Sequence, residues 1–139
     1  MKEKLLVYWP GLLLFIIAFV AGIASYKDYG VSWDEPLQRD LGVVTYNYVF
    51  KGDTALKTYG DRALGAGFEL PLVIMEKCLH LADAREIYPA RHLATHIFFL
   101  VSVFLGYVLA LRLFKNQFIG CLGFVLLAFN PRIYAHSFF

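Results

Sequence analysis

The chain has 139 residues, of which 59% are hydrophobic and 17% are aromatic. A water-soluble domain of this length rarely carries so much apolar material, because too little polar surface remains to face water. The formal net charge is only +2, so the composition indicates an integral membrane protein and argues against a nucleic-acid partner.

The first predicted membrane span covers residues 5–26, which contain no charged side chain. A helix needs about 20 apolar residues to cross the ~30 Å of hydrocarbon in a bilayer. A cleaved signal peptide is the alternative, since Gly22-Ile23-Ala24 resembles a cleavage site. The apolar stretch is longer than the roughly 7–15 residues of a signal peptide, so we favour an anchor.

Two further apolar runs, residues 93–112 and 117–136, predict a second and a third span. A continuous helix in the third span would place Arg132 about 22 Å from Gln117 along its axis. The link between these runs, about residues 112–116, is short and basic, and short basic loops stay cytoplasmic.

Topology follows from the positions of the basic residues. Lys2 and Lys4 put the N-terminus on the same cytoplasmic side as the basic link. The sequence therefore predicts an all-α, multi-pass protein of the cell (inner) membrane, with residues 27–91 as a long extracytoplasmic loop.

Two amphipathic stretches of this loop, residues 36–50 and 64–82, predict helices that lie in the membrane interface. The second stretch could instead be another span. Glu69, Glu76 and Lys77 would make that costly, because charged side chains are expensive inside a bilayer.

Asp34 and Glu35 are the candidate catalytic residues, and they follow the first span within Ser32-Trp33-Asp34-Glu35-Pro36. Pro36 suits the first turn of a helix, which makes Asp34 or Glu35 the expected N-cap. A helix N-terminus favours an ionised carboxylate, and such a group can take a proton from an acceptor hydroxyl. The alternative is simple capping by a solvated charge.

Cationic and imidazole side chains gather at the predicted outer ends of the other two spans. Arg91, Arg132 and His136 are candidates for binding a lipid phosphate or another part of a substrate, although an arginine there can also snorkel to the interface. His92 and His96 share one helical face, which permits a divalent metal site, but two histidines alone do not make one. Interfacial hydrogen bonding is the other reading of both histidines.

The order of these features resembles the start of the GT-C glycosyltransferases: one span, a loop that opens with an Asp-Glu pair, interfacial helices, and two spans with a short link. The protein O-mannosyltransferase and aminoarabinose-transferase type is the most similar. The residues that carry the likeness are the segment from Ser32 to Pro36 and the ending Asn130-Pro131-Arg132-Ile133-Tyr134-Ala135-His136-Ser137-Phe138-Phe139.

The resemblance implies a multi-pass enzyme that transfers a sugar from a polyprenyl-phosphate carrier to a hydroxyl of a glycan, lipid or protein acceptor, with inversion. Asp34 matches the family's first acid and would be the base, and Glu35 matches the second and would orient it. Arg132 and His136 fall where the family's second outer loop begins, without an established family role.

The resemblance also implies many more spans, so we expect residues 1–139 to be the N-terminal part of one transmembrane domain, poorly active alone. A non-enzymatic three-span membrane module, or a partner subunit, is the alternative. A piece of a secondary transporter is a weaker third reading, which would require broken helices or ionisable groups near the middle of the membrane.

Overall fold

The computed structural model describes residues 7–139, and this part of the chain is 77% helical with no strand. The all-α prediction is therefore confirmed. The chain divides into two compact units, which we describe in turn. The bundle unit comprises the residues up to Tyr29 and those from His92 to Phe139, and the loop unit comprises Gly30–Arg91. Lys2, Lys4 and the first residues of the predicted span 5–26 lie outside the described residues.

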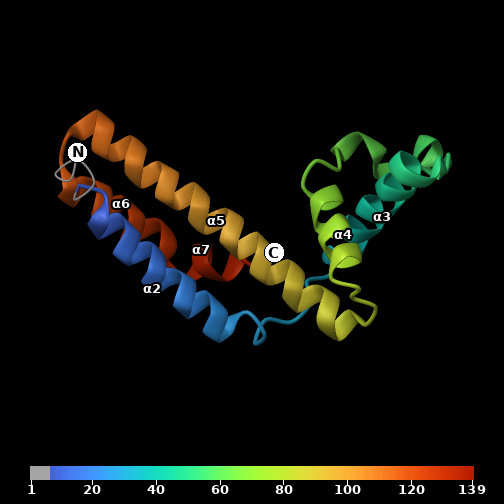
Figure 1. Cartoon of the computed structure of the whole chain (residues 1–139), viewed down its shortest axis with the longest axis horizontal. Coiled ribbons are helices and arrows are strands. Elements are labelled where there is room, and N and C mark those ends of the chain that lie inside the picture. Colours follow the sequence, from blue (N-terminus) through green and yellow to red (C-terminus); the bar gives the residue numbers. More distant parts are fainter. Residues whose placement is uncertain (1–6) are drawn as a thin grey trace. The chain divides into compact units, whose positions relative to one another are not determined.

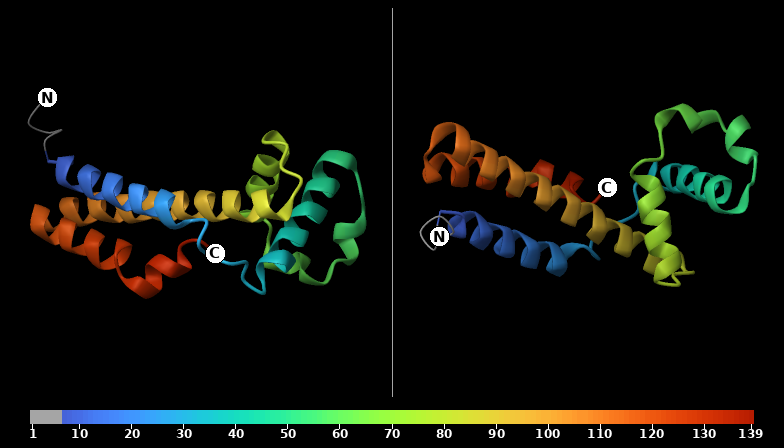
Figure 2. Two further views of the ribbon diagram at one scale, coloured as in Figure 1. Left: turned by 90° about the horizontal axis from the view of Figure 1, so that it is seen from below. Right: turned by 45° about the horizontal axis from the view of Figure 1, so that its top comes forward.

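The bundle unit is built from α2 (Trp9–Ser25), the greater part of α5 (Ala84–Phe114) and α6 (Gln117–Ala128), which lie side by side (Figures 1 and 2). Among the described helices, only α5 is long and apolar enough to cross a membrane, whereas α2 and α6 are shorter apolar helices. The 31 residues of α5 give this helix a length of about 46 Å. The buried core of this unit comprises Ala18, Leu100, Val103, Tyr107, Leu111, Phe124 and Ala128.

Small residues bring α2 and α5 close together. The buried positions of α2 are Gly11, Ala18 and Gly22. A Cβ atom at Gly11 would lie 2.2 Å from the ring of Tyr107, and one at Gly22 would lie 2.4 Å from the ring of His96. The two rings therefore rest directly against the α2 backbone, which is the packing that small residues allow between membrane helices.

The predicted second span, residues 93–112, lies entirely within α5, but the helix begins earlier, at Ala84. Asp83 starts it, because its side chain accepts a hydrogen bond from the backbone N–H of Arg85 and its carbonyl accepts from Glu86 and Ile87. The change from polar to apolar composition therefore does not mark a helix end.

The prediction of one continuous helix over residues 117–136 is wrong. The chain forms α6, a break at Phe129 and Asn130, and then the short helix α7 (Pro131–His136). Pro131 drives the preceding residue away from helical geometry, and Asn130 is extended, with φ −66° and ψ 122°. The Asn130 side chain accepts hydrogen bonds from the N–H groups of Arg132 and Ile133. Arg132 thus belongs to a separate helix from Gln117, and the 22 Å rise does not apply.

The loop unit consists of α3 (Glu35–Lys51), two short 3-10 helices, η1 (Ala55–Thr58) and η2 (Gly60–Leu64), α4 (Glu69–Cys78), and the first residues of α5. Helix α3 packs against α4. The predicted helix over residues 36–50 is confirmed, and it ends at Gly52, whose φ of 71° suits a glycine C-cap.

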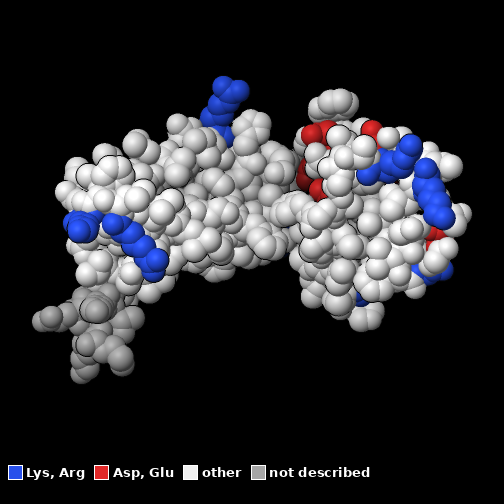
Figure 3. All heavy atoms as spheres, turned by 90° about the horizontal axis from the view of Figure 1, so that it is seen from above, with Lys and Arg blue, Asp and Glu red and all other residues white. Residues whose placement is uncertain are grey.

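The predicted helix over residues 64–82 is shorter than expected. Leu64 ends η2, a turn containing Gly65 and Gly67 follows, and α4 covers only Glu69–Cys78. The helix stops there because the chain turns at His80, which has a positive φ of 55°. In Figure 3 the visible face of the bundle unit carries few charged residues, whereas charged residues of both signs crowd the loop unit.

Candidate functional site

Asp34 occupies the N-cap position of α3, as the Pro36 signal predicts. Its side chain does not accept a helix N–H, so the expected capping bond is missing. The half-exposed carboxylate instead accepts a hydrogen bond from the Ser32 hydroxyl and a longer one, 3.3 Å, from Nε2 of Gln38. Side chains from both sides of the helix start therefore orient Asp34 while part of it stays accessible.

Glu35 is buried, with 5% of its surface exposed. Its Oε2 accepts a hydrogen bond of 2.6 Å from the backbone N–H of Ser32. Ser32 thus donates its hydroxyl to one acid and its N–H to the next, and it fixes the turn that carries both. The two adjacent acids therefore differ in environment. Asp34 is partly exposed, whereas Glu35 is buried and holds the turn at Ser32.

Arg91 lies in a buried network that we call the ionic cluster, formed by Arg39 of α3, Glu69 and Glu76 of α4, and Arg91 of α5. Nη1 of Arg91 lies 2.8 Å from Oε1 of Glu76, and Nη2 bonds Glu69. Nη2 of Arg39 lies 2.8 Å from Oε2 of Glu76. With two carboxylates on its guanidinium and 4% of its surface exposed, Arg91 is held inside the loop unit.

The ionic cluster balances two positive with two negative charges, which buried ions require. The hydrogen bond to Glu76 raises the pKa of Arg39 above its ordinary value. Sequence reasoning placed Glu69 and Glu76 in a predicted interfacial helix and missed this role. Their spacing on α4 was visible, but Arg39 lies 37 residues from Glu76 and no local signal joins them.

His92 and His96 are both buried in the bundle unit, with 1% and 0% of their surfaces exposed. Nδ1 of His96 lies 2.7 Å from Oγ of Ser137, and the His96 ring stacks on Phe138 with centroids 4.4 Å apart. Within residues 7–139, no group of three His, Cys, Asp or Glu side chains could hold a metal ion. The alternative to a metal site was hydrogen bonding by these histidines. His96 makes such a hydrogen bond, and its partner is the side chain of Ser137 in the same unit.

The last residues of the chain are packed into the bundle unit. The Tyr134 hydroxyl lies 2.7 Å from the Ser25 hydroxyl of α2, and the Ser137 hydroxyl donates to the Tyr134 carbonyl. Tyr29 stacks on Phe138, with centroids 4.4 Å apart, and burial raises the pKa of its phenol. The segment that carries part of the family resemblance thus joins α2 to α5, a role that sequence reasoning missed.

Arg132 and His136 are exposed and lie one turn apart on α7. They are therefore available to an anionic group, unlike Arg91. They belong to the bundle unit, whereas Asp34, Glu35 and Arg91 belong to the loop unit. The expected meeting of acids and cations at one membrane level involves both units and stays a prediction.

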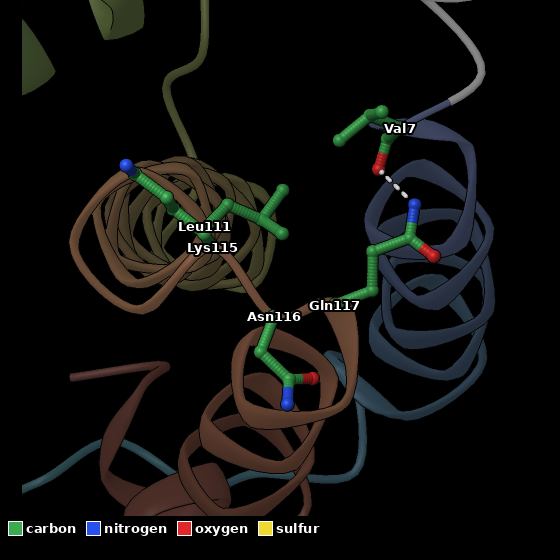
Figure 4. Close-up of a pocket in the computed structure, with 5 residues that line it drawn as sticks. All are labelled: Val7, Leu111, Lys115, Asn116 and Gln117. Carbon is green, nitrogen blue, oxygen red and sulfur yellow. Dashed lines mark hydrogen bonds between the residues drawn. The ribbon is translucent and has the colours of Figure 1, made fainter.

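An open pocket of about 630 Å³ lies at the α5–α6 link, lined by Val7, Leu111, Lys115, Asn116 and Gln117 (Figure 4). Gln117 Nε2 donates a hydrogen bond of 3.2 Å to the Val7 carbonyl across it. None of the predicted site residues lines this pocket, so it is not the place where the predicted chemistry would occur.

Within residues 7–139 the fold is all-helical, with one helix that is long and apolar enough to cross a membrane. No protein-family description, curated protein or solved structure matches this chain. Its function must therefore be argued from its own residues.

Proposed function

We propose that the protein is a membrane-bound glycosyltransferase of the GT-C type, which moves a sugar from a polyprenyl-phosphate carrier to an acceptor hydroxyl at the outer membrane–water interface. The observation that carries the proposal is the half-exposed Asp34 carboxylate at the start of α3, nine residues after the end of α2. Ser32 and Gln38 orient it, and the buried Glu35 supports its turn.

The proposal includes three membrane spans, formed by α2, α5 and α6 with α7. The pattern of exposure supports it, because all three helices expose many large apolar side chains, and α2 and α6 bury glycine and alanine, whereas a water-soluble bundle buries most of its large apolar residues. The exposed residues include Leu12, Ile16 and Val20 of α2, Val101, Leu105 and Leu109 of α5, and Phe118, Leu122 and Leu126 of α6.

Helix α6 is only about 18 Å long, so the third crossing must continue through the break at Asn130. A broken helix in a membrane needs partners for its freed backbone groups, and the Asn130 side chain supplies them for two N–H groups of α7. A broken helix is also the feature that the third reading, a secondary transporter, would require. Because Asn130 already caps α7, these N–H groups are not open to a substrate.

In the proposed reaction, Asp34 takes the proton of the acceptor hydroxyl as its oxygen attacks the anomeric carbon. The bond from that carbon to the phosphate oxygen breaks, and the lipid phosphate leaves with the electron pair. Asp34 lies at the N-cap position of α3, and Glu35 is a positioning residue. We assign the lipid phosphate to the exposed Arg132 and His136, since charge-assisted hydrogen bonds suit a phosphate. The guanidinium of Arg91 is occupied by Glu69 and Glu76, so we give Arg91 a structural role.

The test is Asp34→Asn in the full-length protein, assayed in membranes with radiolabelled polyprenyl-phosphate sugars as donors. Removal of a general base should lower turnover by about 10²–10⁴-fold at equal expression. Asp40→Asn is the matched control, because Asp40 is an exposed carboxylate on the same helix. Full turnover in the Asp34 variant would eliminate Asp34 as the base.

A non-enzymatic membrane module is the second candidate, and the ionic cluster favours it. All four of its charges are satisfied within the protein, so the loop unit can be a folded spacer that needs no substrate. This candidate predicts that Asp34→Asn leaves every cellular phenotype of the protein unchanged. Variants that disrupt the ionic cluster and unfold the loop unit should instead change the phenotype.

A further inference from the structure

Three large apolar side chains are exposed around the start of α3. Val31 exposes 50% of its surface, Trp33 86% and Leu37 52%. We call these three residues the α3-start patch. Asp34 lies between Trp33 and Leu37 in the sequence, so residues of the patch flank the candidate base along the chain.

The exposure of Trp33 calls for an explanation. A hydrophobic residue just before an N-cap commonly packs back onto its own helix, and tryptophan is highly buried on average. Trp33 directly precedes the N-cap Asp34 and yet is the most exposed large apolar residue of the described chain. The loop unit has its own buried apolar residues in Leu41, Leu72, Val73 and Ile87, so the patch is not needed for its core.

The chain connections indicate what covers the patch. Only seven residues separate Trp33 from Ser25, the end of a proposed span, and these include Tyr26 and Tyr29. The loop unit leads at its other end into α5 without a helix break. Tryptophan and tyrosine concentrate where membrane helices meet the headgroups, because one end of each side chain is apolar and the other polar.

We propose that Val31, Trp33 and Leu37 insert into the outer leaflet and hold the start of α3 at the headgroup level. The acidic Asp34 and Asp40 beside the patch favour a zwitterionic lipid surface over an anionic one. The inference rests on the membrane location in the proposed function and is independent of sugar transfer. It would place Asp34 where a lipid-linked donor presents its phosphate.

The two tryptophans of the chain, Trp9 and Trp33, allow a direct test. The full chain carrying Trp9→Phe is reconstituted in phosphatidylcholine vesicles, and the emission of Trp33 is quenched by brominated phosphatidylcholine or by iodide in the water. We expect a blue-shifted emission maximum and a larger loss of emission with brominated lipid than with iodide. Strong iodide quenching without an effect of brominated lipid would overturn the inference.

Two controls separate the possible failures. Trp33→Phe leaves Trp9 of α2, and its lack of quenching by brominated lipid would reject the proposed span and, with it, the inference. Lys57→Trp in a chain without the native tryptophans probes an exposed site of η1 in the same unit. This probe should respond to iodide and not to lipid. Equal lipid quenching at residues 57 and 33 would show that the patch is not the inserted element, which also overturns the inference.

Discussion

The two units of the chain are packed in opposite ways. In the bundle unit, glycine and alanine of α2 and α6 face inward, and many leucine, isoleucine and phenylalanine side chains are exposed. In the loop unit, leucine and valine are buried together with the charged side chains of Glu35, Glu76 and Arg91, and Arg39 and Glu69 are partly buried. Both units are helical, so secondary structure does not distinguish them.

The difference is the one expected if lipid surrounds the bundle unit, as the proposed function requires, and water surrounds the loop unit. Where lipid surrounds helices, apolar side chains gain little from burial, and close backbone contact between small residues holds the helices together. Where water surrounds them, burial of apolar surface drives folding, and buried charges must be paired. If this account is correct, the same kind of substitution should have different effects in the two units.

The largest effect should come from the ionic cluster. Glu76→Gln would leave Arg39 and Arg91 without their shared carboxylate, and breaking a buried ion pair in this way costs about 3–5 kcal/mol. We expect rapid amide hydrogen exchange across α3 and α4, with protection in α2 and α6 retained. Glu86→Gln, at an exposed acid of α5, is the control and should change neither. Unchanged exchange in the Glu76 variant would mean that the cluster does not hold the loop unit together.

An intermediate effect is expected at the contact between α2 and α5. Gly22→Ala would place a methyl group 2.4 Å from the His96 ring, and overpacking of this kind costs about 1–3 kcal/mol. The melting temperature in detergent should fall. Gly106→Ala makes a good comparison, because a Cβ there meets nothing within 4 Å, and alanine favours a helix over glycine by about 1 kcal/mol. Equal responses at both glycines would contradict close packing at Gly22.

Local sequence signals predicted much of the fold. The charge-free run and the Pro36 signal located α2 and the start of α3, and the apolar run located the membrane-compatible part of α5. The break before α7 was also readable, because the Asn130-Pro131 pair both disfavours a continuing helix and supplies an N-cap. The prediction of a continuous helix over residues 117–136 followed their apolar composition and left out the effect of the Asn130-Pro131 pair.

The environments of the candidate residues were much harder to predict. Asp34 and Glu35 are adjacent, and nothing in their sequence tells which carboxylate is buried. The partner of Arg39 is 37 residues away, and that of His96 is 41 residues away in Ser137. Such pairs depend on how helices pack, and a single sequence does not record it. The position of Arg91 in the sequence therefore suggested a ligand for phosphate, whereas its partners in the structure are carboxylates of the preceding helix, α4.

The smallest effect should come from the polar contact that joins α7 to α5. Ser137→Ala removes the hydrogen bond between Oγ of Ser137 and Nδ1 of His96, a buried contact of 2.7 Å, and also the local bond from the Ser137 hydroxyl to the Tyr134 carbonyl. The bond between the helices is worth about 1 kcal/mol. We expect a small fall in the melting temperature in detergent and faster amide exchange confined to α7. Ser102→Ala is the control, because the Ser102 hydroxyl bonds only the Phe98 carbonyl one turn back on an exposed face of α5. If both serine variants behave alike, the contact between Ser137 and His96 adds nothing to the stability that the small-residue packing gives to the bundle unit.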